Sequence, residues 1–148
     1  MSESVAVEKS VVVRCSVTHA FRVFTDRIDL WWPPSHRKDP SSVFFLEAGE
    51  GGRFGERLPA GEERVLGEVL LWEPPERLVY SWWPGAIEAP TRVEVRFSPE
   101  SGATRVDVRH TVGDSGLGEQ WPSRAAIFTR AWDQVLPAFA AATEEERA

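Results

Sequence analysis

The sequence lacks the features of disulfide-rich, secreted and membrane-spanning proteins. Its single cysteine, Cys15, excludes an internal disulfide framework and is typical of a protein from a reducing compartment. The N-terminus carries Glu3, Glu8 and Lys9 and no long apolar run, so neither a secretion signal nor a spanning helix is expected. We therefore expect a cytoplasmic protein that does not insert into a membrane.

Positive charge is also scarce. Seventeen Lys and Arg residues face 23 Asp and Glu residues, which gives a formal net charge of -6 over 148 residues. General affinity for nucleic acids or anionic membranes depends on a surplus of Lys and Arg close to phosphate groups. The composition therefore argues against both of these partners.

Motifs for catalysis, metal binding and nucleotide binding are missing or weak. The three histidines and one cysteine lack the spacing of metal ligands, so no metal or cofactor is expected. Residues 113–116 (Gly-Asp-Ser-Gly) are similar to the surroundings of a trypsin-type serine, but no base can be placed beside them, and a turn is the better interpretation. The glycines of residues 49–52 precede no helix and indicate a hairpin. Glutamates such as Glu56 are expected to be exposed and indicate no carboxylate pair.

Aromatic residues, in contrast, are abundant. The seven tryptophans are Trp31, Trp32, Trp72, Trp82, Trp83, Trp121 and Trp132. Side chains of this size either pack a core or line a pocket, and a buried indole N–H needs a hydrogen-bond partner.

One long amphipathic helix is predicted near the C-terminus, from Ser123 to Ala142. Its apolar residues recur at spacings of three and four and form one stripe: Ile127, Phe128, Ala131, Trp132, Val135, Leu136 and Phe139. Pro137 lies inside this segment and is expected to bend the helix or to mark where its last turns diverge.

Most of the chain before this helix is predicted to form strands. The first runs from Val5 to Arg14, and Ser16 then caps a short helix, Val17 to Thr25. A second helical turn ends at Pro33-Pro34, and a mobile loop follows to Ser42. The remaining strands are expected at residues 43–47, 53–58, 64–73, 77–83, 91–98 and 104–112.

Charge alternation selects the register of the last two strands. Their outward residues are charged, and like charges directly opposite one another destabilise an antiparallel ladder. The favoured register places Arg96 opposite Asp107, Glu94 opposite Arg109 and His110 beside Val93.

These elements indicate an α+β protein with one domain over residues 1–148. A single long helix after a run of strands must bury its apolar stripe against one concave sheet. We expect a curved antiparallel sheet of about six or seven strands wrapped round the C-terminal helix, with two short helices after the first strand. The tail, residues 143–148, is expected to be frayed.

This order of elements resembles the START-like helix-grip (SRPBCC) superfamily. Within it the chain is similar to single-domain bacterial members of the family of activator of heat-shock-protein (Hsp) ATPase homologues. The matching segments are residues 20–26 (AFRVFTD), 31–33 (WWP), 51–54 (GGRF), 67–70 (GEVL), 72–79 (WEPPERLV), 104–110 (TRVDVRH) and 132–136 (WDQVL). The resemblance implies a hydrophobic cavity between sheet and helix, in a superfamily that includes lipid binders, polyketide cyclases, hormone receptors and chaperone activators.

His110 and Tyr80 are the candidate polar groups of such a cavity. Strand alternation places His110 inward, among valines, where its imidazole could donate to or accept from a ligand. The alternative is a core histidine whose nitrogens bind neighbouring protein groups. Tyr80 points inward if Leu78 does, and its hydroxyl is both donor and acceptor. The candidate apolar lining consists of Trp31, Trp32, Trp82, Phe128 and Trp132, for which ordinary core packing is the alternative.

The leading hypothesis is a protein, monomeric or homodimeric, that binds a small apolar or aromatic molecule between the sheet and the helix. The cavity mouth is expected near Trp31, Trp32 and the loop after Pro33. A second hypothesis is a protein-interaction module akin to the chaperone activators, with an exposed apolar patch around Trp72 and Trp83. A third is a cyclase-like enzyme in which His110 acts as general base, although no catalytic motif supports it.

Overall fold

The computed structural model describes residues 6–82, 91–112 and 121–145 of the chain. Its elements are β1 (Val7–Val13), α1 (Val17–Thr25), α2 (Ile28–Trp31), the 3-10 helix η1 (Pro34–His36), β2 (Val43–Leu46), β3 (Arg53–Arg57), β4 (Glu63–Glu73), β5 (Arg77–Trp82), β6 (Thr91–Glu100), β7 (Ala103–Thr111) and α3 (Trp121–Glu145). The expected elements are therefore present in the expected order, with boundaries that differ by a few residues.

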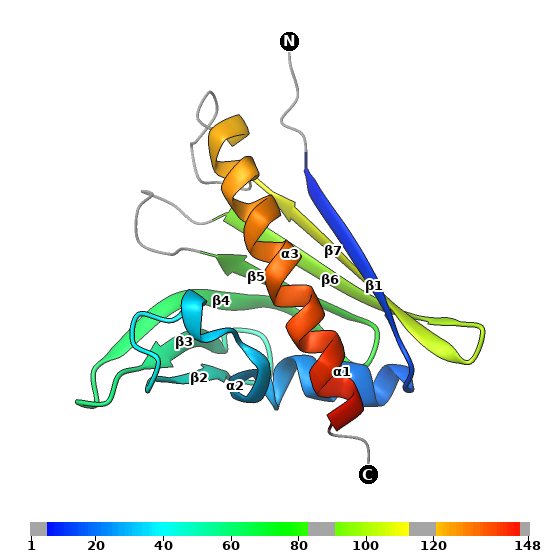
Figure 1. Cartoon of the computed structure of the whole chain (residues 1–148), viewed down its shortest axis with the longest axis horizontal. Coiled ribbons are helices and arrows are strands. Elements are labelled where there is room, and N and C mark those ends of the chain that lie inside the picture. The colour runs from blue at the N-terminus through cyan, green and yellow to red at the C-terminus, as the bar shows by residue number, and fades with distance from the viewer. Residues whose placement is uncertain (1–5, 83–90, 113–120, 146–148) are drawn as a thin grey trace.

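The strands form one curled antiparallel sheet of seven strands in the order β1-β7-β6-β5-β4-β3-β2. Helix α3 crosses this sheet, and α1 and α2 lie close to its C-terminal end (Figure 1). The predicted α+β helix-grip architecture is confirmed.

The register of β6 and β7 matches the charge argument. Arg96 pairs with Asp107, Glu94 with Arg109, and Val93 with His110. Successive side chains of a strand point to opposite faces, so the charged residues of both strands face outward and the residues between them face the core. The inward residues, which include Val93, Val95 and Val108, are fully buried.

Local chemistry explains the short helix after β1. The hydroxyl of Ser16 accepts a hydrogen bond from the backbone N–H of His19, 3.1 Å away, and so satisfies one of the free donors at the start of α1. The apolar side of α1 buries Phe21 and Phe24. Phe24 packs against Phe97 of β6 and Phe139 of α3, at ring-centroid distances of 5.9 and 5.3 Å. These contacts join α1 to both the sheet and α3.

A glycine allows β4 to bend closely over β5. A Cβ atom at Gly67 would lie 1.8 Å from the carbonyl oxygen of Ser81, so no other residue fits without moving a strand. Just beyond it, the β4–β5 register shifts between Val69 and Leu71. The glycine and the irregular register together curl the sheet towards α3.

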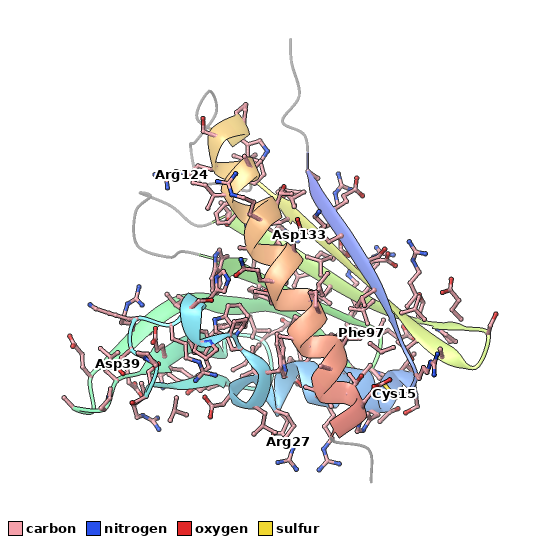
Figure 2. The ribbon with its side chains drawn as sticks, viewed as in Figure 1. Cys15, Arg27, Asp39, Phe97, Arg124 and Asp133 are labelled. Carbon is pink, nitrogen blue, oxygen red and sulfur yellow. The ribbon has the colours of Figure 1, made fainter. Side chains whose placement is uncertain are left out.

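Helix α3 contacts β1 through an ion pair as well as through packing. Lys9 Nζ lies 2.7 Å from Asp133 Oδ1, and Figure 2 shows Asp133 on the helix. The helix continues through Pro137 without interruption and ends later than expected. The predicted fraying of the tail is wrong for Thr143, which is buried in α3 and whose carbonyl oxygen lies 3.2 Å from His19 Nε2.

The segment after Pro33 also differs from the predicted mobile loop, because polar contacts hold it at several points. Arg37 Nη1 donates to Asp29 Oδ1 over 2.6 Å and to the carbonyl oxygen of Ser42 over 2.7 Å. The buried carboxylate of Glu56 accepts from Lys38 N and from the Ser42 hydroxyl. The expectation that Glu56 is exposed is wrong, because loop and strand cover it completely.

Candidate functional site

A cavity of about 230 Å³ lies between α3 and the inner face of the sheet. Its lining is almost entirely apolar or aromatic and comes from four parts of the chain: Trp32, His36, Tyr80, Trp82, His110, Ile127, Phe128, Ala131, Trp132 and Val135. Six of the seven predicted ligand-binding residues are in this set.

The packing of α3 explains why the space is left in this region. Towards its C-terminal end the helix packs on α1 and α2, and Phe139 fills the gap between Phe24 and Trp31. About two helical turns before Phe139, Ala131 offers only a methyl group to the sheet side, so space remains above β5 and β7.

His110 joins the helix to the sheet through a continuous chain of hydrogen bonds. The indole Nε1–H of Trp132 donates to His110 Nδ1 over 3.2 Å. Because Nδ1 accepts, the neutral ring carries its hydrogen on Nε2, which lies 2.8 Å from the Thr91 hydroxyl oxygen and donates to it. The Thr91 hydroxyl in turn donates to the carbonyl oxygen of Trp82 over 2.9 Å.

The His110 ring is held neutral as well as in place. Burial lowers the pKa of His110 to about 3, because the cavity wall offers the imidazolium no solvation. The ring also stacks on Phe128 at a centroid distance of 4.2 Å. Both ring nitrogens are bound to protein groups, as in the core-histidine alternative, and only the ring surface is left to face a ligand.

Tyr80 provides the polar group that remains available. Its side chain is fully buried and lines the cavity, yet no residue that the structure describes forms a hydrogen bond with its hydroxyl. Burial raises the pKa of Tyr80, so the hydroxyl stays protonated and can both donate and accept. A ligand oxygen in the cavity can therefore form a hydrogen bond with this hydroxyl.

Trp82 and Trp32 form aromatic walls beside Tyr80. As the period-two argument predicted, Trp82 follows Leu78 and Tyr80 on the inner face of β5. Its ring lies 5.7 Å from that of Trp32, whose indole Nε1 donates to the carbonyl oxygen of His36 over 3.2 Å.

Trp31 is not part of the cavity lining. Its indole Nε1 donates to the carbonyl oxygen of Val23 over 2.8 Å, and its ring packs between Phe24 and Phe139. The expectation that it lines the site is therefore not met, because α2 turns it into the core. Trp83 and residues 113–116 lie outside the described residues.

Four lining residues were not among the predicted site residues: Ile127, Ala131 and Val135 from the apolar stripe of α3, and His36, the polar one. His36 ends η1, is half-buried, and its Nε2 lies 2.8 Å from Oε1 of Gln134 on α3. Ile127, whose side chain is exposed, lines the cavity together with it. The sequence offered little to identify His36, because it lies three residues after Pro33 in a segment without periodicity.

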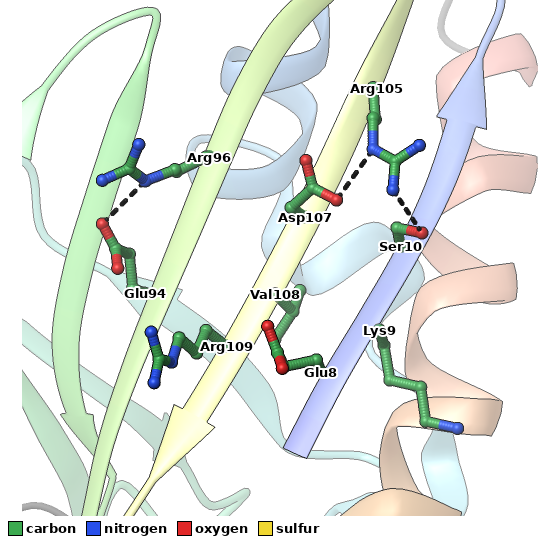
Figure 3. A pocket seen from close by; sticks show the side chains of 9 residues that line it. All are labelled: Glu8, Lys9, Ser10, Glu94, Arg96, Arg105, Asp107, Val108 and Arg109. Carbon is green, nitrogen blue, oxygen red and sulfur yellow. Dashed lines mark hydrogen bonds and ion pairs between the residues drawn. The ribbon is translucent and has the colours of Figure 1, made fainter. Parts of the chain in front are cut away.

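A second depression, of about 390 Å³, lies on the opposite face of the sheet over β1, β7 and β6 (Figure 3). Charged side chains line it, and they pair mostly with each other. Arg96 Nε lies 3.0 Å from Glu94 Oε2, and Arg105 Nε lies 2.9 Å from Asp107 Oδ1. These pairs are largely exposed, as expected for a solvated outer face.

No helix within residues 6–82, 91–112 and 121–145 is long and apolar enough to cross a membrane. Nor do these residues bring three histidine, cysteine or carboxylate side chains together as a metal site would.

Comparisons with solved structures give several matches along most of the chain. An anthrahydroquino-γ-pyrone synthase, Txn09, is 35% identical, with a TM-score of 0.61 and coverage of 95% of this chain and 99% of that one. DynU16, from the dynemicin biosynthetic locus, is 20% identical, with a TM-score of 0.69 and coverage of 97% and 48%. A Rhodobacter sphaeroides protein is 18% identical, with a TM-score of 0.71 and coverage of 100% and 98%.

The two more distant structures show a shared fold alone. A comparison with curated protein sequences gives no match. The family model described as Activator of Hsp90 ATPase homolog 1-like protein matches residues 14–144, nearly the whole chain. The chain therefore belongs to the Activator of Hsp90 ATPase homolog 1-like family, within the START-like helix-grip (SRPBCC) superfamily.

Proposed function

We propose that this protein binds a small planar aromatic molecule in the cavity between α3 and the sheet, with an oxygen of the ligand hydrogen-bonded to Tyr80. The observation that carries the proposal is the hydroxyl of Tyr80, which is buried in an aromatic wall and has no partner among the described residues. A lining of this kind, largely apolar with one orienting polar group, is typical of small-molecule sites.

The size of the cavity limits the ligand. Its volume of about 230 Å³ is below the range of about 300–1,000 Å³ that holds drug-sized molecules. A molecule with one or two fused rings fits this space. Flat rings are favoured because Trp82, Trp32 and Phe128 offer flat faces for stacking.

The chemistry of the polar group narrows the class further. A protonated phenol is a good donor to a carbonyl oxygen and an acceptor from a ligand hydroxyl. Charged ligands are disfavoured, because no charged side chain lines the cavity within the described residues. Aromatic ketones and phenols therefore suit the site better than fatty acids or phosphorylated compounds.

A second candidate function is synthesis of a ring compound in this cavity. The supporting observation is the 35% identity, over nearly the whole length of both chains, to the anthrahydroquino-γ-pyrone synthase. His110 is a poor general base for such a reaction, since both of its ring nitrogens bind protein groups and burial lowers its pKa to about 3.

The protein-interaction alternative has less support. Trp72, which was expected to contribute to an exposed patch, packs its ring edge-on to Phe21 at 5.2 Å and is only partly exposed. The largest exposed apolar side chains, which include Val12, Leu30 and Val65, come from different elements. Scattered apolar residues of this kind are common on protein surfaces.

Tryptophan fluorescence tests the proposal, because three indoles, those of Trp32, Trp82 and Trp132, line the cavity. The titrants are 1-indanone, 1-naphthol, the hydrocarbon indane and a long-chain fatty acid. We expect saturable changes with the first two, weaker binding of indane and none of the fatty acid. Absence of a saturable change with every aromatic titrant, confirmed by calorimetry, would overturn the proposal.

A further inference from the structure

The imidazole of His36 differs from that of His110 in the number of ring nitrogens that are bound. His36 Nε2 lies 2.8 Å from Gln134 Oε1. An amide oxygen can only accept, so Nε2 carries the hydrogen and the neutral ring has its lone pair on Nδ1. No residue that the structure describes forms a hydrogen bond with this Nδ1.

The position of His36 is fixed by contacts on both sides. Its carbonyl oxygen accepts the indole N–H of Trp32, and its neighbour Arg37 is held by the Asp29 carboxylate and by three backbone carbonyl groups. The side chain is half-buried and lines the same cavity as Tyr80. The ring therefore stands at the cavity with one basic nitrogen free, and it keeps contact with solvent.

We propose that His36 is the proton-transfer group of this cavity, acting on an acidic C–H bond of a planar aromatic ketone whose carbonyl oxygen is bound by Tyr80. This inference rests on the proposed binding function. Gln134 is then a positioning residue that fixes the tautomer of His36. The Tyr80 hydroxyl is the donor that stabilises the negative charge developing on the ketone oxygen.

The step can be written for 1-indanone as a probe. His36 Nδ1 takes a proton from C2, and the electron pair of that C–H bond forms the C1=C2 double bond. The carbonyl π pair moves onto oxygen, where the Tyr80 hydroxyl donates a hydrogen bond to the enolate. In D2O the imidazolium exchanges its proton with solvent and returns a deuteron to C2. The net change is replacement of H by D at C2 and of D by H in one solvent molecule, with D2O as the only other reactant.

The test is the rate of H/D exchange at C2 of 1-indanone, followed by proton NMR in D2O, with binding measured by calorimetry on the same samples. We expect the native protein to exceed the His36→Gln variant by about 100-fold in exchange rate, within the range for general acid–base catalysis. Binding should change by less than about twofold, because glutamine keeps a side chain of similar length at this position of the lining.

Three further variants separate base, positioning residue and bystander. Gln134→Leu removes the acceptor of His36 Nε2, so we expect a lower exchange rate and ¹⁵N resonances of His36 that shift towards a mixture of tautomers. Gln134→Glu keeps an acceptor, so both the exchange rate and the ¹⁵N resonances should stay close to those of the native protein. Arg130→Gln, at an exposed position of the same helix, serves as the control with unchanged exchange.

The outcomes are distinct. Binding of 1-indanone with equal exchange in native protein and His36→Gln overturns this inference and leaves the proposed binding function intact. Exchange that survives in His36→Gln but is lost in a folded His110→Gln variant assigns the base to His110 and overturns it as well. Failure of the native protein to bind any aromatic titrant overturns both proposals.

Discussion

The indole of Trp132 on α3 donates to the imidazole of His110 on β7, and this 3.2 Å bond determines what His110 can do. It occupies Nδ1 and so directs the only ring hydrogen towards Thr91. The histidine that the sequence singled out is thereby a link between helix and sheet, and the groups left free for a ligand are Tyr80 and His36.

The first prediction concerns pH and stability. The folded-state pKa of His110, about 3, lies below the unfolded value of about 6.5, so the unfolded chain binds the extra proton between these values. Stability is therefore complete above about pH 6.5 and falls as the pH is lowered towards 3. We expect a loss of about 1–2 kcal/mol between pH 7.5 and 5 in urea unfolding. A His110→Gln variant that is folded should lack this slope, and an equal slope in both proteins contradicts the assignment.

The second prediction concerns the hydroxyl of Thr91. Thr91→Val keeps the shape but removes the acceptor of His110 and the donor to Trp82, which leaves buried polar groups unpaired. We expect a loss of about 1–3 kcal/mol in the free energy of unfolding. Thr111→Val, at the end of β7 and outside the cavity lining, is the matched control and should differ little from native. Equal effects of the two substitutions would show that the hydrogen-bond chain contributes nothing.

The third prediction concerns the buried carboxylate of Glu56. Its two oxygens accept from Lys38 N, from the Ser42 hydroxyl and from Arg64 Nη1, 2.9 Å away. In Glu56→Gln an NH2 group, which cannot accept, replaces one of the two oxygens, so we expect a loss of about 2–4 kcal/mol in the free energy of unfolding, measured with urea.

Because Glu56 holds the loop that carries His36, the same variant should also show faster amide hydrogen exchange at residues 36–39. Glu47→Gln is the control, since Glu47 is an exposed carboxylate bound to Arg53 and its replacement should change stability little. Native-like stability and exchange in Glu56→Gln would contradict the anchoring role.

The fourth prediction fills the cavity from the helix. Ala131→Leu adds three carbon atoms to the lining, and we expect affinity for 1-indanone to fall by more than about tenfold while stability stays within about 1.5 kcal/mol of native. Ala141→Leu adds the same atoms on the exposed side of α3 and is the control. Undiminished binding in Ala131→Leu, measured by calorimetry, would place the ligand elsewhere.

Much of the fold follows from patterns that act over short distances. The β6–β7 register was predictable because charges alternate on one face and valines on the other, and the inward direction of Tyr80 and Trp82 followed from strand period alone. The stripe on α3 was visible for the same reason. These features depend on neighbours in sequence or on one partner strand.

The site was less predictable because it depends on contacts between distant segments. Sequence period could not distinguish Trp31, which α2 turns into the core, from Trp32, which lines the cavity. The burial of Glu56 and the contact of His36 with Gln134 both arise where a loop without periodicity folds against other elements. Only the assembled structure shows that the nitrogens of His110 are occupied.

The most direct measurement is the calorimetric affinity of native protein and Tyr80→Phe for 1-indanone and for indane, which has the same rings without the oxygen. Loss of one neutral hydrogen bond should weaken 1-indanone binding by about 5- to 10-fold and leave indane binding unchanged. Removal of a hydroxyl that has no protein partner should not destabilise the fold. Equal affinities of the two proteins for 1-indanone would contradict the claim that Tyr80 orients a ligand in this cavity.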